Sequence, residues 1–373
     1  MKKRYDVAAY IWPSYTGDEP RTRIFWPEGY GEWQTVRNAM KNSGEKPEGY
    51  KWDRKPLWGY VNEANPDVME MEIECAARHG VNVFIYDWYW YDRRPFLENC
   101  LNDGYLKARN NDKVKFYIMW ANHDARHLWS VPLSSDFLNE VIWRGDVDRP
   151  EFEKVVNRII EKYFSHPSYY KIDGKPVFMI YDLRKLVDGL GSVKATVDAL
   201  DYFREQTKKA GFPGLYLQVS ARGAAFMVNT PEGPADAYRD FGFDGVSDYQ
   251  TYSITPEDRV YDFTEVNEAA AKHYETMSKK EGICYFPSVS VGWDTNPRFL
   301  KNLPRTTVNN TPENVEVAMR QAKDYIDSHD LPAPLVTVNS WNEWTETSYL
   351  QPDNVYGYGY LEAIKRVFVD DEE

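Results

Sequence analysis

The sequence predicts an α/β fold, a single (β/α)8 barrel over residues 1–373 with a long, elaborated loop after its first strand. Eight short apolar runs alternate with longer segments of helical pattern. Most of these runs are continuously apolar, as expected of parallel strands that are buried on both faces. No repeat, low-complexity run or flexible linker interrupts this alternation, so we expect a single domain.

The helical segments between the strands carry recognisable start and stop signals. Asn65-Pro66 supplies an N-cap followed by proline at the first helical position, and Gly80 follows the end of that helix. Thr311-Pro312 opens a second helix in the same way. The helical pattern is weaker after the second and fifth strands. The predicted strands are residues 5–12, 81–88, 114–121, 177–182, 215–220, 243–250, 283–293 and 335–341, and further helices are expected at 152–163, 192–211, 264–280 and 358–369.

A doubly wound open sheet is the alternative arrangement of such a pattern. The first strand is followed by WPSYTGDEP, which lacks the glycine-rich loop that binds dinucleotide phosphates. We therefore prefer the barrel, with residues 13–65 as its elaborated first loop.

The composition excludes several classes of function. A formal net charge of −13 without a basic face argues against a nucleic-acid partner, and no run approaches the ~18 apolar residues of a membrane span. Three widely spaced cysteines indicate neither a disulfide framework nor a zinc site. The apolar segment near the start is short and contains Tyr10 and Trp12, so it indicates a strand rather than a secretory leader. We expect a cytoplasmic protein, or an exported one whose leader has been removed.

Aromatic residues make up 16% of the chain, with 13 Trp and 28 Tyr, and this load suggests rings exposed for stacking on sugars. The active site of a (β/α)8 barrel lies at the carboxyl ends of its strands, and aromatic, acidic and amide residues follow most of the predicted strands. This composition predicts a carbohydrate-binding cleft. The candidate substrate-binding residues are Trp12, Asp87, Trp88, Tyr89, Trp90, Trp120, Asn122, His123, Tyr181, Tyr249, Tyr252, Trp293, Asp294, Trp341, Asn342 and Trp344.

Glu343 and Glu346 are the candidate catalytic residues. They are three positions apart just after the eighth strand, where a turn would bring both side chains to the same side. Glycoside cleavage requires two carboxyl groups, one protonated and one ionised, and Trp341 and Trp344 would favour the protonated form of one of them by lowering the local dielectric. The alternative is that these acids pair with an arginine or cap the turn.

Other motifs carry less weight. His123 and His127 have helical metal-ligand spacing but no third ligand, so we expect no metal site. Asp146-Val147-Asp148 has the acid-x-acid pattern of metal-dependent glycosyltransferases, but it precedes a helix start, where acids favour the helix dipole. No GxSxG motif is present.

The string WNEWTETSYLQPDNVYGYGYLEAIK resembles the C-terminal motif of glycoside hydrolase family 99-like domains, including the WbsX-type proteins of polysaccharide loci that are often labelled glycosyltransferases. The resemblance extends to residues 56–98, to FYIMWANHDAR and to GWDTNPR. It implies a metal-free retaining hydrolase of α-mannose-type glycosides, in which Glu343 is the base on the substrate 2-hydroxyl and Glu346 the acid and then base.

That route implies a 1,2-trans substrate such as an α-mannoside or α-L-rhamnoside, because the 2-oxygen attacks from the face opposite the leaving group. The sequence departs from the family pattern at Thr347, where glycine is usual, at Gln351, where glutamate is common, and at His123, where an acid often stands. Two other hypotheses are a glycosyltransferase of bacterial polysaccharide assembly and a non-catalytic glycan-binding barrel.

Overall fold

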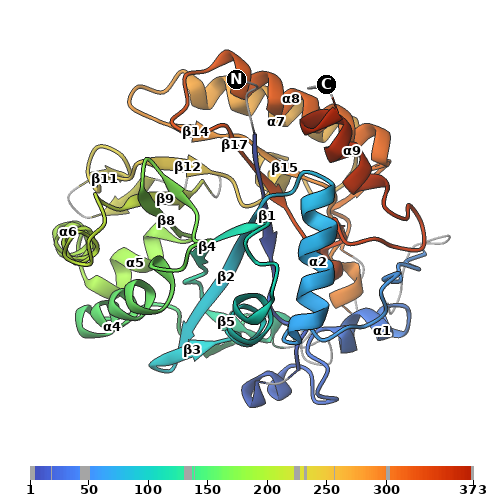
Figure 1. The fold of residues 1–373 in the computed structure, drawn as a ribbon, viewed down its shortest axis with the longest axis horizontal. Helices are drawn as coiled ribbons and strands as arrows, with labels where there is room; N and C mark the ends of the chain where they lie inside the picture. Colours follow the sequence, from blue (N-terminus) through green and yellow to red (C-terminus); the bar gives the residue numbers. More distant parts are fainter. Residues whose placement is uncertain are drawn as a thin grey trace.

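We analysed a computed structural model of the chain, which describes residues 5–17, 19–42, 51–129, 137, 139–221, 227–230, 233–255, 257–299 and 303–370. Parallel strands occupy its centre and helices lie around them (Figure 1). The barrel strands are β1 (Asp6–Ile11), β2 (Val83–Tyr91), β4 (Lys115–Trp120), β8 (Lys175–Ile180), β9 (Tyr216–Ser220), β12 (Gly245–Ser247), β14 (Tyr285–Phe286), β15 (Ser288–Ser290) and β17 (Leu335–Asn339).

The barrel closes at its seventh strand, which Pro287 divides into β14 and β15. The strands follow the spatial order β14-β12-β9-β8-β4-β2-β1-β17-β15, and all of these pairs are parallel. Because β14 pairs with β12 and β15 pairs with β17, one strand joins the two ends of the sheet. Proline has no N–H to donate to the ladder, which explains the break. The predicted (β/α)8 barrel is therefore confirmed, with all eight strands near their expected positions.

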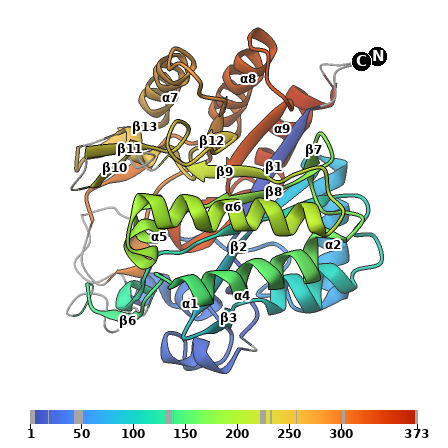
Figure 2. The ribbon, with the colours of Figure 1, turned by 90° about the vertical axis from the view of Figure 1, so that its left-hand side faces the viewer.

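The helices lie outside the strands, with α4, α5 and α6 side by side on one flank and α7, α8 and α9 on another (Figures 1 and 2). The predicted caps are present, because Asn65 accepts a hydrogen bond from the N–H of Asp67 and Thr311 accepts one from the N–H of Asn314. The helices are α1 (Trp33–Asn42), α2 (Pro66–Arg78), α4 (Arg149–Ile159), α5 (Leu183–Leu190), α6 (Val193–Lys209), α7 (Phe263–Ser278), α8 (Pro312–Ser328) and α9 (Gly359–Phe368).

The two segments with weak helical patterns differ from a regular barrel helix. After β2 the chain forms the short strand β3 (Arg94–Phe96) and then the helical turns η2 (Cys100–Gly104) and η3 (Tyr105–Lys107). After β9, the described residues form a hairpin of β10 (Met227–Thr230) and β11 (Gly233–Asp236) in place of the expected helix. The sequence there contains Pro231, Gly233 and Pro234, which disfavour a helix.

The barrel interior is built from alternate residues of each strand. Tyr10 donates a hydrogen bond to the backbone oxygen of Asp248, and Ser247 of β12 bonds Thr337 of the non-adjacent strand β17 at 2.8 Å. Successive side chains of a strand point to opposite faces, so the neighbours of these inward residues pack against the outer helices. This alternation decides which predicted site residues reach the active-site end.

Smaller elements complete the fold and form the loops. They are η1 (Pro20–Ile24), β5 (Ala125–Arg126), η4 (His127–Trp129), β6 (Val141–Trp143), η5 (Ile160–Phe164), β7 (Lys171–Ile172), η6 (Thr251–Ile254), β13 (Val260–Asp262), η7 (Asn296–Arg298), β16 (Thr306–Val308), β18 (Asn342–Glu343), η8 (Trp344–Glu346) and β19 (Ser348–Tyr349). None of the helices that the structure describes has the length and apolar character needed to cross a membrane.

Candidate active site

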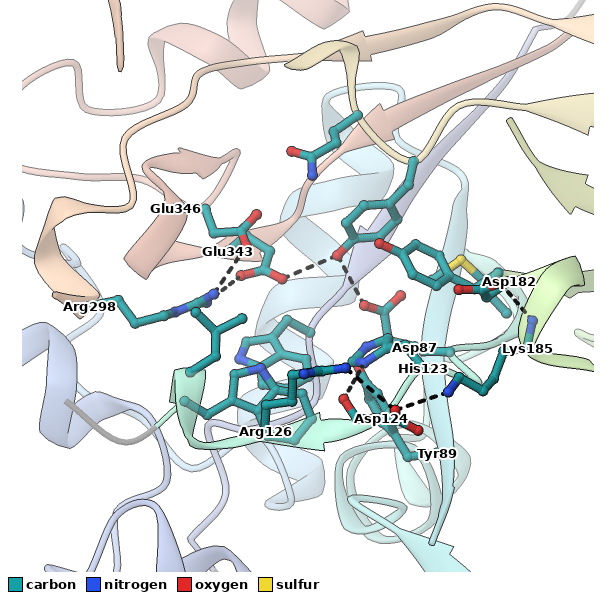
Figure 3. Close-up of a pocket in the computed structure, with 18 of the residues that line it drawn as sticks. Asp87, Tyr89, His123, Asp124, Arg126, Asp182, Lys185, Arg298, Glu343 and Glu346 are labelled. Carbon is teal, nitrogen blue, oxygen red and sulfur yellow. Dashed lines mark hydrogen bonds and ion pairs between the residues drawn. The ribbon is translucent and has the colours of Figure 1, made fainter. Parts of the chain in front are cut away.

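A cavity of about 430 Å³ lies at the carboxyl ends of the barrel strands, where barrels of this type hold their active sites. Glu343, Glu346 and Arg298 lie on one side of it, and Asp124, Lys185 and Asp182 on the other (Figure 3). The lining residues are Trp12, Asp87, Tyr89, Met119, Ala121, His123, Asp124, Arg126, Leu128, Trp129, Tyr181, Asp182, Lys185, Tyr249, Gln250, Trp293, Arg298, Glu343 and Glu346.

The two glutamates reach the cavity through a tight turn after β17. Glu343 ends β18, Glu346 ends the 3-10 turn η8, and β19 then pairs back antiparallel with β18. Side chains three residues apart in a 3-10 turn lie above one another. The hydroxyl of Ser340 accepts a hydrogen bond from the N–H of Glu343 and donates one to the backbone oxygen of Ser348, which fixes the turn. Both carboxyl groups consequently line one cavity, and both are largely buried.

Tyr249 connects Glu343 to a third acid, Asp87 of β2. Its hydroxyl oxygen is 3.1 Å from Oε1 of Glu343 and 3.0 Å from Oδ2 of Asp87. A tyrosine hydroxyl carries one proton and can donate to only one of these oxygens. The other contact becomes a hydrogen bond only if its carboxyl group is protonated. A chain from protonated Asp87 through Tyr249 to ionised Glu343 satisfies both contacts.

Arg298 is the cation of this cluster, with 3% of its surface exposed. Its Nη1 lies 3.2 Å from Oε1 of Glu346, and its Nη2 lies 3.5 Å from Oε2 of Glu343. Its Nε lies 3.3 Å from Oε1 of Glu32, a further buried acid. One guanidinium thus faces three carboxyl groups, which favours retention of a proton among the acids of the cavity.

Burial is the main influence on the ionisation of these acids. It raises the pKa of Glu343 well above its usual value, and the charge of Glu346 adds to this, while Arg298 acts in the opposite direction. Burial likewise raises the pKa of Glu346 against the effect of Arg298. Burial raises the pKa of Asp87 well above its usual value, and contact with the hydroxyl of Tyr249 acts in the opposite direction. Oε2 of Glu346 and Oδ1 of Asp87 have no hydrogen-bond partner among the described residues.

Nine of the predicted site residues come together at the cavity: Trp12, Asp87, Tyr89, His123, Tyr181, Tyr249, Trp293, Glu343 and Glu346. Among the aromatic members of this set, Trp12 packs edge-on to Tyr89, and Tyr181 packs edge-on to Tyr249. The cavity therefore has an aromatic wall built from inward-facing residues at the strand ends. Its rings are less exposed than the composition suggests, because Trp12 and Tyr89 are each 2% exposed. The side chain of Tyr252, another candidate, lies outside the described part of the chain.

The other five tryptophans among the candidate substrate-binding residues do not line the cavity. Trp88 and Trp90 alternate with Asp87 and Tyr89 on β2 and point outward, where their indole N–H groups bond Glu98 and Glu151. The remaining three, Trp120, Trp341 and Trp344, are at most 1% exposed. Trp341 donates to Glu72 of α2, and Trp344 stacks on Tyr349 at 3.8 Å and donates to Gln351.

Asn122, Asp294 and Asn342 also hold the framework instead of lining the cavity. The amide of Asn122 bonds the backbone of Asp182 in both directions, and that of Asn342 does the same to Trp12. Asp294 accepts hydrogen bonds from Asn296. The two asparagines each tie two loops at the carboxyl ends of the strands, and Asp294 holds its own loop in place. Polarity at a strand end alone therefore does not separate loop anchors from ligands.

Several lining residues were not predicted to be functional. Arg298 lies in the quoted string GWDTNPR, but no sequence spacing relates it to Glu343 or Glu346. Lys185 pairs with Asp124 at 2.9 Å, and Arg126 lies 3.6 Å from the same acid. Trp129 packs against Trp12 and Phe25. A pair of opposite charges on separate loops leaves no local pattern, so only the fold reveals these contacts.

Two departures from the family pattern have a structural explanation. Thr347 has a φ of 54°, in the left-handed region that favours glycine, and its hydroxyl compensates by donating to the backbone oxygen of Asp294 and accepting from Trp52. Gln351 accepts from Trp344 and donates to the buried Glu63 at 3.0 Å. An ionised glutamate at position 351 could not donate that second hydrogen bond.

Within the described ranges, no group of three or more histidine, cysteine, aspartate or glutamate side chains is arranged to hold a metal ion. His123 packs edge-on to Tyr89 and Tyr181, and its Nδ1 is 3.0 Å from the backbone oxygen of Asp124. Its ring is therefore part of the aromatic wall.

Comparison with solved structures finds the same barrel in glycoside hydrolases. A glycoside hydrolase-like protein superposes with a TM-score of 0.60 and 16% identity, over 98% of this chain and 94% of the other. The GH99 endo-alpha-mannosidase from Bacteroides thetaiotaomicron superposes with a TM-score of 0.58 and 14% identity, over 98% and 97%. At these identities the similarity establishes the shared fold.

The chain belongs to the WbsX family, whose description is "Glycosyltransferase WbsX" and whose model matches residues 7–364. The resemblance noted from the sequence motifs is therefore confirmed. Two proteins named WxcX, from strain B100 and a second strain of Xanthomonas campestris pv. campestris, are each 23% identical over 369 residues. The match covers 93% of this chain and 47% of each relative, so the chain spans about half the length of the curated relatives that it matches.

Proposed function

We propose that the protein is a retaining glycoside hydrolase that cleaves a 1,2-trans glycosidic bond, α-mannoside-like or α-L-rhamnoside-like, in a glycan or polysaccharide. The observation that supports this most is the pair Glu343 and Glu346, two buried carboxyl groups on one turn that share Arg298 at an aromatic-walled cavity. Two acids in this setting are the minimum that glycoside cleavage requires.

In the proposed first step, Glu343 accepts the proton of the substrate 2-hydroxyl while that oxygen attacks C1. The bond from C1 to the leaving oxygen breaks, and Glu346 donates its proton to that oxygen. The sugar product is a 1,2-anhydro sugar. The hydrogen-bond chain through Tyr249 suits this role, because it supplies a donor to ionised Glu343 from a neutral Asp87.

In the second step, Glu346 accepts a proton from water, the water oxygen bonds to C1, and the bond between C1 and O2 breaks. Glu343 returns its proton to O2, which restores both carboxyl groups. Two inversions at C1 give net retention. Oε2 of Glu346 makes no hydrogen bond to the described residues, so no protein group competes for the proton that it would transfer.

Binding of the sugar is assigned to the residues that line the cavity. The rings of Trp12, Tyr89, Tyr181, Tyr249 and Trp293 provide apolar edges and faces for the sugar ring. Asp124, Arg126 and Lys185 provide charged hydrogen-bonding groups on the side opposite the two glutamates (Figure 3). Other proposals are that residues 1–373 form one catalytic barrel domain and that the hydrolase needs no cofactor.

The experiment uses 4-nitrophenyl α-D-mannoside and α-L-rhamnoside, their 2-O-methyl derivatives, and bacterial polysaccharides with these linkages. We expect release from substrates with a free 2-hydroxyl and none from the 2-O-methyl derivatives, while α-D-glucosides, which are 1,2-cis, are not cleaved. Comparable cleavage of a 2-O-methyl derivative contradicts the role of O2.

The family description favours a second candidate, a glycosyltransferase, and the same samples test it. Sugar transfer from a nucleotide-linked or lipid-linked donor, without hydrolysis of any glycoside in the panel, would support that candidate. Binding of glycans that is unchanged in Glu343→Gln and Glu346→Gln, without either reaction, would support a binding module.

A further inference from the structure

Glu32 is a fully buried carboxyl group in the long first loop, directly before α1, and it is not among the residues that line the cavity. Its Oε1 accepts a hydrogen bond of 2.9 Å from the hydroxyl of Thr345 and lies 3.3 Å from Nε of Arg298. Its Oε2 accepts a hydrogen bond from the indole N–H of Trp12. Glu32 therefore joins the first loop to three residues of the active-site end.

Thr345 places this contact between the two catalytic candidates. It lies between Glu343 and Glu346 in the sequence, and its hydroxyl oxygen accepts from Nε and Nη2 of Arg298 at 3.1 and 2.7 Å. Because this hydroxyl donates its one proton to Glu32, its hydrogen-bonding groups are all used within the cluster. The guanidinium is thereby fixed with Nη1 toward Glu346 and Nη2 toward Glu343 (Figure 3).

The backbone conformation directly before Glu32 determines the position of this residue. Gly31 has a φ of 57°, and a Cβ there would lie 1.7 Å from the backbone oxygen of Ser14. The N–H of Glu32 donates to that same oxygen at 3.2 Å. Only glycine allows so close an approach, and it brings Glu32 into the space behind Arg298.

We propose that Glu32 is a positioning residue for the cleavage reaction, holding Arg298 between Glu343 and Glu346 and Trp12 against the cavity. The long first loop then contributes a residue that the active site requires. This inference rests on the proposed function, because it assigns Glu32 a role through the two catalytic glutamates.

The charge of Glu32 also affects the two glutamates. Burial is the main cause of the raised pKa of Glu343 and Glu346, the charge of Glu32 raises both further, and Arg298 lowers both. Removing the negative charge at position 32 should therefore lower both pKa values. The other titratable groups that face this pair are Asp87 and Tyr89 of β2, Tyr249 after β12, and Tyr15 of the first loop.

The test replaces Glu32→Gln, with Glu32→Asp as the conservative variant. For Glu32→Gln we expect kcat on the best 4-nitrophenyl glycoside of the panel to fall about 10- to 100-fold and both limbs of the pH–rate profile to move about one unit toward acid. Glu32→Asp keeps the charge, so we expect a smaller loss of rate and a pH profile like that of the parent. The KM should change less than kcat, because Glu32 does not touch the sugar.

The matched control is Glu98→Gln. Glu98 is also a buried acid that bonds an arginine, Arg158, and a tryptophan indole, Trp88. It lies on the outer side of β2 and does not line the cavity. We expect this variant to lose stability and keep the parental pH profile. A Glu32→Gln profile that coincides with that of the parent and of Glu98→Gln would overturn the inference.

A second measurement requires no substrate. The pH dependence of the unfolding midpoint reports carboxyl pKa values that folding raises. The midpoint should decline as the pH rises above the unfolded carboxyl pKa of about 4.3, and Glu32→Gln should reduce this decline, whereas Glu98→Gln should not. Equal declines in the parent and Glu32→Gln would also overturn the inference. Full activity in Glu343→Gln and Glu346→Gln would instead reject the proposed function, so the two failures are distinguishable.

Discussion

Glu346→Gln separates the two proposed proton-transfer roles when the leaving group is varied. The amide has the shape of the carboxyl group, and its oxygen can keep the contact with Nη1 of Arg298, which is 3.2 Å in the parent. What is lost is the proton for the leaving oxygen. We therefore expect the rate on alkyl and oligosaccharide glycosides to fall about 10²–10⁴-fold, equivalent to roughly 3–5 kcal/mol of transition-state stabilisation.

Glycosyl fluorides provide the contrast, because fluoride leaves without being protonated. On α-D-mannosyl or α-L-rhamnosyl fluoride we expect Glu346→Gln to lose much less in formation of the anhydro sugar than it loses on the alkyl glycoside. Glu343→Gln removes the base that every substrate needs, so its loss should be similar for both leaving groups. Fluoride release, measured by an ion-selective electrode, and alkyl glycoside consumption, measured by chromatography, give the two rates.

Stability measurements exclude the simplest alternative, which is that these variants unfold. Each substitution removes one of the buried acids around a single guanidinium, and burial raises the pKa of both Glu343 and Glu346. The unfolding temperature should therefore be equal to or above that of the parent near pH 8. Equal losses on fluoride and alkyl glycoside in Glu346→Gln, in a folded protein, would refute its assignment as the acid.

Tyr249→Phe removes the hydroxyl between Asp87 and Glu343, and we expect kcat/KM to fall about 10- to 100-fold. The acid limb of the pH–rate profile should move to higher pH, because ionised Glu343 loses a hydrogen-bond donor. An unchanged pH–rate profile would contradict this reasoning. Thr347→Val keeps the left-handed strain and loses two hydrogen bonds, so it should destabilise by about 1–3 kcal/mol. Thr347→Gly also relieves strain of about 1–2 kcal/mol, so urea unfolding should place it closer to the parent, and the reverse order would contradict the explanation. Burial raises the pKa of Glu63 to about 7, above the unfolded value of about 4.3. The folded state then binds more protons, and its free energy of unfolding falls as pH rises from about 4.5 to 7; Glu63→Gln should flatten that fall in denaturant titrations, and a parental slope would contradict the assignment.

The fold could be predicted from the sequence because its signals are local. Each barrel strand is a short apolar run, and proline-marked N-caps such as Asn65-Pro66 and Thr311-Pro312 show where helices begin. The hairpin after β9 is not predicted by the repeated strand–helix pattern, although Pro231, Gly233 and Pro234 disfavour a helix there.

The site was predictable in part for the same reason. Glu343 and Glu346 belong to one turn, so their approach to one cavity follows from their spacing. Position after the second strand predicts a shared site for Trp88, Trp90, Asp87 and Tyr89. Alternation along β2 instead places the two tryptophans on the face opposite Asp87 and Tyr89.

Arg298 and Glu32 could not be found from local patterns. Their contact joins η7 to the first loop, and Thr345 links both to the catalytic turn. The three positions are far apart in the chain, and none of them has a distinctive spacing to the other two. Only the closed barrel brings them together.

The most direct test of the central claim is a proton NMR time course of the wild-type protein acting on an α-mannoside or α-L-rhamnoside with a free 2-hydroxyl. The account predicts that the α-anomer of the released sugar appears first, that mutarotation follows, and that Glu343→Gln and Glu346→Gln release far less sugar. First appearance of the β-anomer, or undiminished release by both variants, would contradict the account.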